Sequence, residues 1–215
     1  MKDFLFCFVV LVVLPVYASE WDCASTSGTF DRSTDCTMSN EVGVYRDLTV
    51  TGKKWVYSTL TAASGMRHFH LFVGAPTLNL QWLNLTGGNV GTCDSCEGGS
   101  IHVKNVAAHL NISHCVFFNN RAGYGGAIYA RDGPATVLLS EISFNQNLAS
   151  LYGGAVYLEN AKLVDHSSMY NMNTAGYDGG ALLLSWGSHS SFFNSSLVSN
   201  TAGIGGGGIY ISGGS

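Results

Sequence analysis

FFNNRAGYGGAIYARDGPATVLLSEISFNQNLASLYGGAVYL, residues 117–158, contains one pattern twice, and the pattern continues to the end of the chain. In each unit a bulky residue stands three positions before an asparagine, and a glycine pair then precedes an apolar run. The units recur every 26 to 27 residues, with asparagines at Asn120, Asn147, Asn173 and Asn200 and bulky residues at Phe117, Phe144, Tyr170 and Leu197. Such repetition is typical of a solenoid, in which each unit buries its apolar face against the next.

The composition of the unit selects the kind of solenoid. Gly, Asn and Ser interrupt every unit, which disfavours helices. The remaining runs, such as residues 136–139 and 155–158, are short and rich in residues that favour strands. Three strands and three turns fill a unit of this length, so the sequence predicts an all-β protein: a single-stranded parallel β-helix of about seven coils.

Stacking explains which residues recur. Equivalent residues of neighbouring coils lie about 4.8 Å apart. We therefore expect the four asparagines to form a side-chain ladder and the four bulky residues to fill the interior beside it. Identical charges at this spacing would repel each other, which agrees with the charged fraction of only 11%. The repeat is thus predicted to be scaffold.

The N-terminal part of the chain differs from the repeats. Lys2 precedes an apolar run that ends near the small residue Ala18, as in a secretory signal peptide. The charged residues Lys53 and Lys54 suit a polar cap over the first coil. We expect a signal peptide at residues 1–18, a cap and first coil at 19–60, and repeats at 61–215. The product is then secreted or held at the cell surface, with membrane contact only through the signal peptide.

The chain stops at Ser215 within a repeat. Two expectations follow. Either the sequence is part of a longer array, or its last coil presents an open strand edge that is available for self-association.

Export makes the cysteines interpretable. Without Cys7 five remain, and we expect disulfides between Cys23 and Cys36 and between Cys93 and Cys96. Cys115 is left either buried or paired with one of the others. For the Cys-x-x-Cys element, a metal half-site and a redox role stay open beside the structural disulfide.

Three sequons agree with export. Asn84, Asn111 and Asn194 each stand two positions before Ser or Thr, so they are N-glycosylation candidates in a eukaryotic host. We expect their side chains to face outward.

Catalytic residues are hard to find. Asp132 and Glu159 are 27 residues apart and are expected to stack beside Arg131, while His68 and His70 flank Phe69 and would share a face of a strand. These five residues are the candidates for a carbohydrate-active site, with calcium as a cofactor only in that case. A solvated corner and exposed strand residues are the simpler interpretations. No metal site is predicted, and the net charge of −4 without a basic patch disfavours nucleic acid.

The repeat resembles a known family. The FxxN element at residues 117–120 and 144–147, followed by GGA and an aliphatic residue, resembles the repeat of the chlamydial polymorphic outer membrane proteins. That repeat is similar to the right-handed parallel β-helix superfamily that includes pectate lyases. The resemblance implies a surface-displayed or secreted β-helix, often adhesive.

Two functions therefore remain. The first is a non-catalytic surface protein that acts in adhesion, ligand display or glycan binding. The alternative is a polysaccharide lyase or hydrolase. Because the recurring residues are scaffold, functional residues are expected where the period breaks: the Cys93–Cys96 loop, residues 67–70 and the C-terminal end.

Overall fold

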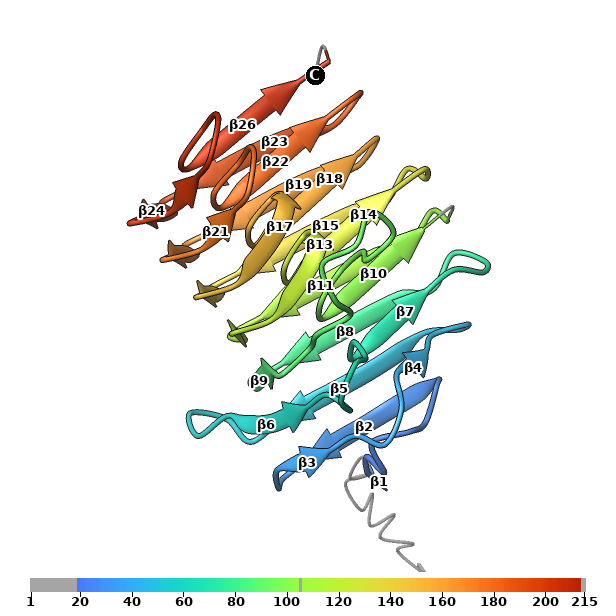
Figure 1. The fold of residues 1–215 in the computed structure, drawn as a ribbon. Helices are drawn as coiled ribbons and strands as arrows, with labels where there is room; N and C mark the ends of the chain where they lie inside the picture. Colours follow the sequence, from blue (N-terminus) through green and yellow to red (C-terminus); the bar gives the residue numbers. More distant parts are fainter. Residues whose placement is uncertain (1–18, 105, 214–215) are drawn as a thin grey trace, which may run out of the picture.

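The computed structural model describes residues 19–104 and 106–213 as a column of stacked β-coils (Figure 1). The predicted signal peptide lies outside these residues. Within them every regular element is a strand, and all strand pairs are parallel. The predicted fold class is confirmed: the chain is a parallel β-helix of about seven turns.

Four sheets run along the column. Sheet A is formed by β1 (Ser19–Glu20), β2 (Gly28–Arg32), β5 (Leu48–Gly52), β8 (Thr77–Gln81), β11 (His109–Ser113), β15 (Thr136–Ser140), β19 (Lys162–His166) and β23 (His189–Phe193). Sheet B is formed by β3 (Cys36–Thr37), β6 (Ser58–Thr61), β9 (Leu83–Thr86), β12 (Val116–Phe118), β16 (Ser143–Asn145), β20 (Met169–Asn171) and β24 (Ser196–Val198). Sheet C is formed by β4 (Val42–Gly43), β7 (Phe69–Leu71), β10 (Ile101–Lys104), β14 (Ile128–Arg131), β18 (Val156–Glu159), β22 (Leu182–Ser185) and β26 (Ile209–Ser212). The short sheet D is formed by β13 (Arg121–Tyr124), β17 (Leu148–Tyr152), β21 (Thr174–Ala175) and β25 (Thr201–Ala202).

Left-handed backbone turns join the sheets. At the corner between sheets A and B, one residue in each of the five coils from β8 onward has a φ of 48° to 57°: Trp82, His114, Glu141, Ser167 and Asn194. Between sheets D and C the left-handed residue is the first glycine of each pair, with a φ of 57° to 70°, at Gly98, Gly125, Gly153, Gly179 and Gly206. A non-glycine residue in this conformation costs about 1 kcal/mol or more, so the stacked neighbours must hold the corners in place.

The second glycine of the pair is required by close packing rather than by its φ. A Cβ on Gly154 would lie 2.0 Å from the carbonyl oxygen of Gly180 in the next coil, and one on Gly180 would lie 2.1 Å from Gly207 O. The backbones of adjacent coils touch here, and only glycine fits.

The bulky column fills the interior. Phe117, Phe144 and Tyr170 are fully buried, and their rings stack with centroids 5.0 and 4.8 Å apart. Leu197 continues the column in strand register with Tyr170 and packs against the core.

The asparagine column lies beside the bulky column. Asn147 Nδ2 donates to Asn173 Oδ1 at 3.0 Å and to Phe117 O at 2.9 Å, while Asn147 Oδ1 accepts from Asn120 N and Nδ2, both at 3.1 Å. Asn173 donates to Asn200 Oδ1 in the same way. Each amide therefore satisfies the turn backbone and its neighbour in the stack.

The interior becomes polar at one point near the C-terminal end. Asp165 follows Leu139 in an inward-facing column of sheet A and is fully buried. Tyr170 donates its hydroxyl to Asp165 Oδ2 at 2.9 Å. Burial raises the pKa of the Asp165 carboxyl, because a low-dielectric interior disfavours the charged form.

Both predicted disulfides are present in the structure. Cys23–Cys36 links the N-terminal segment to sheet B, and Cys93–Cys96 closes the loop between β9 and β10. Cys115 is a buried free thiol, and burial raises its pKa to about 12. It therefore behaves as a small apolar core residue.

Candidate functional site

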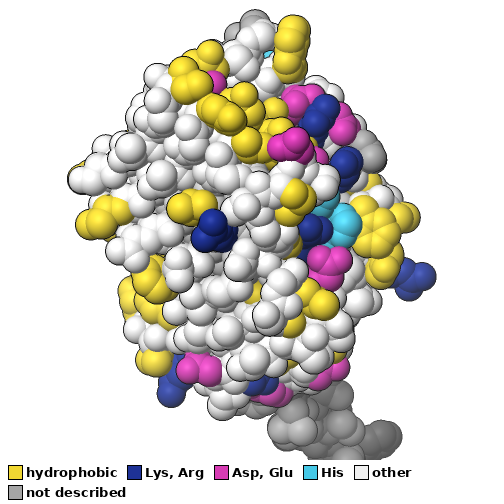
Figure 2. All heavy atoms as spheres, in the orientation of Figure 1, with side chains coloured by type: hydrophobic (Ala, Val, Ile, Leu, Met, Phe, Trp, Pro, Cys, Tyr) yellow, Lys and Arg dark blue, Asp and Glu magenta, His cyan; other side chains and the backbone are white. Residues whose placement is uncertain are grey.

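The outer face of sheet C carries a continuous row of rings. His70, His102, Tyr129 and Tyr157 are in strand register, with successive centroid distances of 4.5, 5.3 and 5.2 Å. The row follows from the strand period, because in β14 and β18 the tyrosine stands between two core residues and so points outward. Figure 2 shows acidic, basic and histidine side chains gathered along one side of this face.

Tyrosines from sheet D cover part of the row. Tyr124 lies edge-on to Tyr157 at 5.7 Å, and its ring is tilted against that of Tyr152 at 5.7 Å. Together with Tyr129, Leu183 and Tyr210 these residues form a second apolar cluster outside the coil. The tyrosines of sheets C and D thus lie together on the outside of the coil.

A groove of 380 Å³ lies beside these tyrosines, and we call it the tyrosine groove. Its lining combines aromatic rings with charged and hydroxyl groups: Tyr124, Arg131, Tyr152, Tyr157, Glu159, Asp178, Leu183, Ser185, Tyr210 and Ser212. Within it Tyr157 donates its hydroxyl to Glu159 Oε2 at 3.1 Å, and Arg131 Nε lies 3.3 Å from Glu159 Oε1.

A polar cluster around Glu97 lies beside the middle of the ring row, at His102 and Tyr129. Tyr129 OH donates to Glu97 Oε1 at 3.0 Å, and Lys104 Nζ lies 3.2 Å from Oε2. His102 Nε2 is also 3.2 Å from Oε2, although its direction does not meet hydrogen-bond geometry. Because Arg67 donates to His102 Nδ1, the proton of the imidazole is assigned to Nε2. Burial lowers the pKa of His102, and the charges of Arg67, His70 and Lys104 lower it further, so the ring is neutral at pH 7.

The Cys93–Cys96 loop holds Glu97 in place. Cys96 O accepts hydrogen bonds from Gly123 N at 2.7 Å and Tyr124 N at 3.0 Å, and Glu97 bridges to Tyr124. The disulfide loop is therefore docked on β13. The loop thereby places Glu97 beside His102 of the same coil and Tyr129 of the next coil.

The histidine candidates do not share a face. His70 is half-buried on the outer face of sheet C, where Nδ1 lies 3.5 Å from Glu41 Oε1. His68 precedes β7 and is fully buried, bonded to Leu60 O through Nε2 and to Ser100 Oγ through Nδ1. The prediction of a shared face is wrong because the strand begins one residue after His68.

The acidic candidates are out of register by one residue. Sheet pairing places Ala130 opposite Leu158, so Glu159 stands beside Arg131 and not beside Asp132. The reason is a bulge in sheet D, where two residues separate Ala149 from Tyr152 but only one separates Ala122 from Tyr124. Arg131 Nε contacts both carboxylates, at 3.2 Å from Asp132 and 3.3 Å from Glu159. The expected stacking of the two acids is therefore wrong.

The sequons differ in accessibility. Asn194 is exposed at an A–B corner, whereas Asn111 is half-buried and donates to Asn79 Oδ1 at 2.8 Å. Asn84 is half-buried, and its Oδ1 is shielded from solvent. Only Asn194 has the open position expected for all three.

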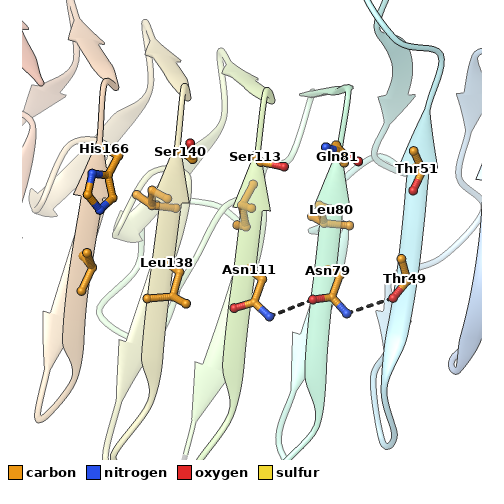
Figure 3. Close-up of a pocket in the computed structure, with 13 residues that line it drawn as sticks. Thr49, Thr51, Asn79, Leu80, Gln81, Asn111, Ser113, Leu138, Ser140 and His166 are labelled. Carbon is orange, nitrogen blue, oxygen red and sulfur yellow. Dashed lines mark hydrogen bonds between the residues drawn. The ribbon is translucent and has the colours of Figure 1, made fainter. Parts of the chain in front are cut away.

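Sheet A presents a second open surface (Figure 3). Its hollow of 640 Å³ is larger than the tyrosine groove. Thr49, Asn79 and Asn111 form a polar row, in which Asn111 donates to Asn79 and Asn79 donates to Thr49 Oγ1 at 2.9 Å. In the strand after Asn111 the row becomes apolar at Leu138. Apart from His166 its lining has no ionisable side chain. The sheet A hollow therefore offers few groups that could form ionic contacts with a ligand. The tyrosine groove is the stronger candidate for a binding site.

His68 makes the fold sensitive to acid. Burial lowers its pKa to about 4, whereas an unfolded histidine has a pKa of about 6.5. Below pH 6.5 the His68 imidazole is protonated in the unfolded chain, whereas in the folded chain it stays neutral until about pH 4. The free energy of unfolding therefore falls by about 3 kcal/mol across this window. Chemical denaturation at pH 7 and pH 4.5 should show a smaller loss for His68→Gln than for the wild type. An equal loss in both proteins would contradict this assignment.

Comparisons with known proteins agree with the fold. The family model described as the Chlamydia polymorphic membrane protein repeat matches residues 114–131 and 141–159. The chain therefore carries the repeat that its sequence resembles, within a parallel β-helix. Neither the curated proteins nor the solved structures gave a match. Among residues 19–104 and 106–213, no helix is long and apolar enough to cross a membrane, and no cluster of three potential metal ligands occurs.

Two of the sequence candidates, Arg131 and Glu159, line the groove. The sequence did not single out its tyrosines, because Tyr124, Tyr152 and Tyr157 stand inside a repeat interpreted as scaffold. The available signal was the tyrosine next to the glycine pair in two successive units, at Tyr124 and Tyr152.

Proposed function

We propose that this chain is the ligand-binding β-helix of a secreted or cell-surface protein, and that the tyrosine groove binds a neutral glycan chain without cleaving it. The matched repeat is named for membrane proteins of Chlamydia, which supports display at a surface. The observation that carries the glycan is the groove itself, where rings and hydroxyl-bonding groups line one trough.

The lining suits the two faces of a sugar. A pyranose offers apolar C–H surfaces to aromatic rings and hydroxyls to polar side chains, and binding sites combine apolar walls with a few placed polar groups. Tyr152 and Tyr210 supply rings that are half-buried and thus reachable. Ser185 and Ser212, joined by a hydrogen bond of 3.2 Å, and Asp178 supply the polar partners.

The charge pattern favours a neutral glycan over a uronate or a sulfated one. Each cation on or next to the strands of sheet C already has a carboxylate partner: Arg67 with Glu41, Lys104 with Glu97, and Arg131 with Glu159 and Asp132. An anionic sugar would have to compete with these internal pairs. Binding is therefore expected to vary little with ionic strength.

One observation bears on the enzyme alternative. Glu159 and Asp178 line the same groove, and glycoside hydrolysis uses two carboxylates. Both oxygens of Glu159, however, are occupied within the chain by Arg131 and Tyr157. This arrangement suits a carboxylate that holds the side chains of Arg131 and Tyr157 in place. Release of reducing or unsaturated ends from a bound polysaccharide would favour the enzyme instead.

Tyr152→Ala is expected to weaken glycan binding at least tenfold, because it removes one wall of the groove. A glycan array followed by titration of the best neutral oligosaccharide measures the effect. Tyr45→Ala is the matched control, since Tyr45 is 50% exposed in the loop between β4 and β5 and does not line the groove. Unchanged affinity in Tyr152→Ala, or binding of acidic glycans alone, would contradict the proposal.

A further inference from the structure

We propose that residues 53–57, the tryptophan loop between β5 and β6, insert Trp55 and Val56 into the interface of an anionic lipid membrane. This surface is separate from the tyrosine groove. The loop lies at the corner between sheets A and B, whereas the groove lies on sheets C and D. Figure 1 shows the loop projecting sideways from the column.

The tip of the loop is apolar and open. Trp55 is 74% exposed and Val56 is 63% exposed. Large apolar side chains are usually buried away from water. A tryptophan beside an aliphatic residue at a projecting tip therefore indicates a binding surface. Tryptophan is also the side chain that favours the level of the lipid headgroups.

The backbone holds this tip rigidly outward. Trp55 has a φ of 65° and Tyr57 a φ of 62°, conformations that are unfavourable for bulky residues. Lys53 O accepts from Val56 N at 3.1 Å and from Tyr57 N at 3.0 Å, and Lys53 N donates to Ser58 Oγ at 3.1 Å. The loop is therefore a fixed turn, and strain of this kind is retained where the surroundings or the function require it.

Stacked rings support the tip from below. The Trp55 ring lies 4.7 Å from the ring of Trp82, which is almost fully buried and stacks on His114 at 4.0 Å. Tyr57 contacts the same Trp82 ring at 5.8 Å. Trp55 is thus the outermost ring of a supported aromatic stack.

The charges around the tip select the partner. Lys53 and Lys54 are exposed, and neither forms a salt bridge with the described residues, unlike Arg32, Arg67, Lys104 and Arg131. Arg46, Arg121 and Lys162 also lack one within residues 19–104 and 106–213, but Lys53 and Lys54 are adjacent to each other and to the apolar tip. Lys54 Nζ instead lies 5.1 Å above the Trp55 ring. Two ammonium groups without a carboxylate partner in the described part of the chain, beside an apolar tip, complement anionic headgroups above an acyl region. A tip of two apolar residues is small for a protein interface, which needs about 1,000 Å² or more.

Quenching of tryptophan fluorescence by brominated lipid tests the insertion. The full chain would be mixed with vesicles of brominated phosphatidylcholine, with and without phosphatidylglycerol. Residues 1–18 contain no tryptophan and add no fluorescence of their own, and the comparison with Trp55→Phe separates insertion of the loop from anchoring by the predicted signal peptide. We expect quenching on the anionic vesicles, its loss in Trp55→Phe, and about fivefold weaker binding for each lysine removed in Lys53→Gln and Lys54→Gln.

Trp186→Phe is the matched control. Trp186 is 66% exposed in a turn between Ser185 and Gly187, without neighbouring lysines in the sequence, so its removal should leave the quenching in place. Quenching that persists in Trp55→Phe would overturn the proposal, and so would the absence of quenching on anionic vesicles. Equal quenching on neutral and anionic vesicles would overturn the choice of an anionic partner. None of these outcomes depends on glycan binding.

Discussion

Replacing Asn147 by Ala is expected to lower the free energy of unfolding by about 4 kcal/mol. Asn147 is 1% exposed, and its amide makes hydrogen bonds to Asn120, Asn173 and Phe117 O. Alanine removes all of them and leaves buried backbone groups without partners. Because Asn120 depends on Asn147, the loss also affects the neighbouring coil.

Urea denaturation followed by circular dichroism measures this change. Asn171→Ala is the control, because Asn171 is a half-buried asparagine of the next coil whose amide makes only a long contact of 3.4 Å to Asn145. It should cost less than about 1 kcal/mol. Equal effects of the two substitutions would show that the buried ladder does not stabilise the stack.

Phe144→Ala is expected to cost about 3–5 kcal/mol, because it leaves a cavity in the middle of the bulky column. Phe144 is fully buried, and its ring stacks on Phe117 and Tyr170. Coils above and below are fixed by sheet pairing, so they cannot close the space. Phe144→Leu keeps most of the volume and should cost about 1–2 kcal/mol.

The same denaturation experiment tests this prediction. Phe118 lies in β12, the neighbouring strand of the same sheet, and is 38% exposed, so Phe118→Ala should have an effect of about 1 kcal/mol or less. A cost for Phe144→Ala no larger than that of Phe118→Ala would contradict the placement of the column inside the coil.

The repeating part of the fold could be predicted from the sequence because stacking makes each position meet its own copy. Asn120 and Asn147 lie one coil apart and bond to each other, and Phe117 pairs with Phe144 in register. The period alone supplies those contacts. Cys93 and Cys96 are close in the chain, so their pairing is also a local property.

The groove could not be predicted in the same way. A single extra residue before Tyr152 moves Glu159 next to Arg131, and counting 27 residues misses such a bulge. Glu97 beside the groove meets Tyr129 of the next coil where the disulfide loop docks on β13, and no spacing in the sequence encodes that path. His68 shows the same limit, since its burial depends on where β7 begins.

The most direct test of the glycan-binding proposal is a crystal structure of the chain with a bound neutral oligosaccharide selected on the array. We expect the sugar rings to lie in the tyrosine groove, against Tyr152 and Tyr210, with hydroxyls within hydrogen-bond distance of Asp178, Ser185 or Ser212. A sugar bound on the sheet A hollow around Asn79 and Leu138, with the tyrosine groove empty, would contradict the proposal.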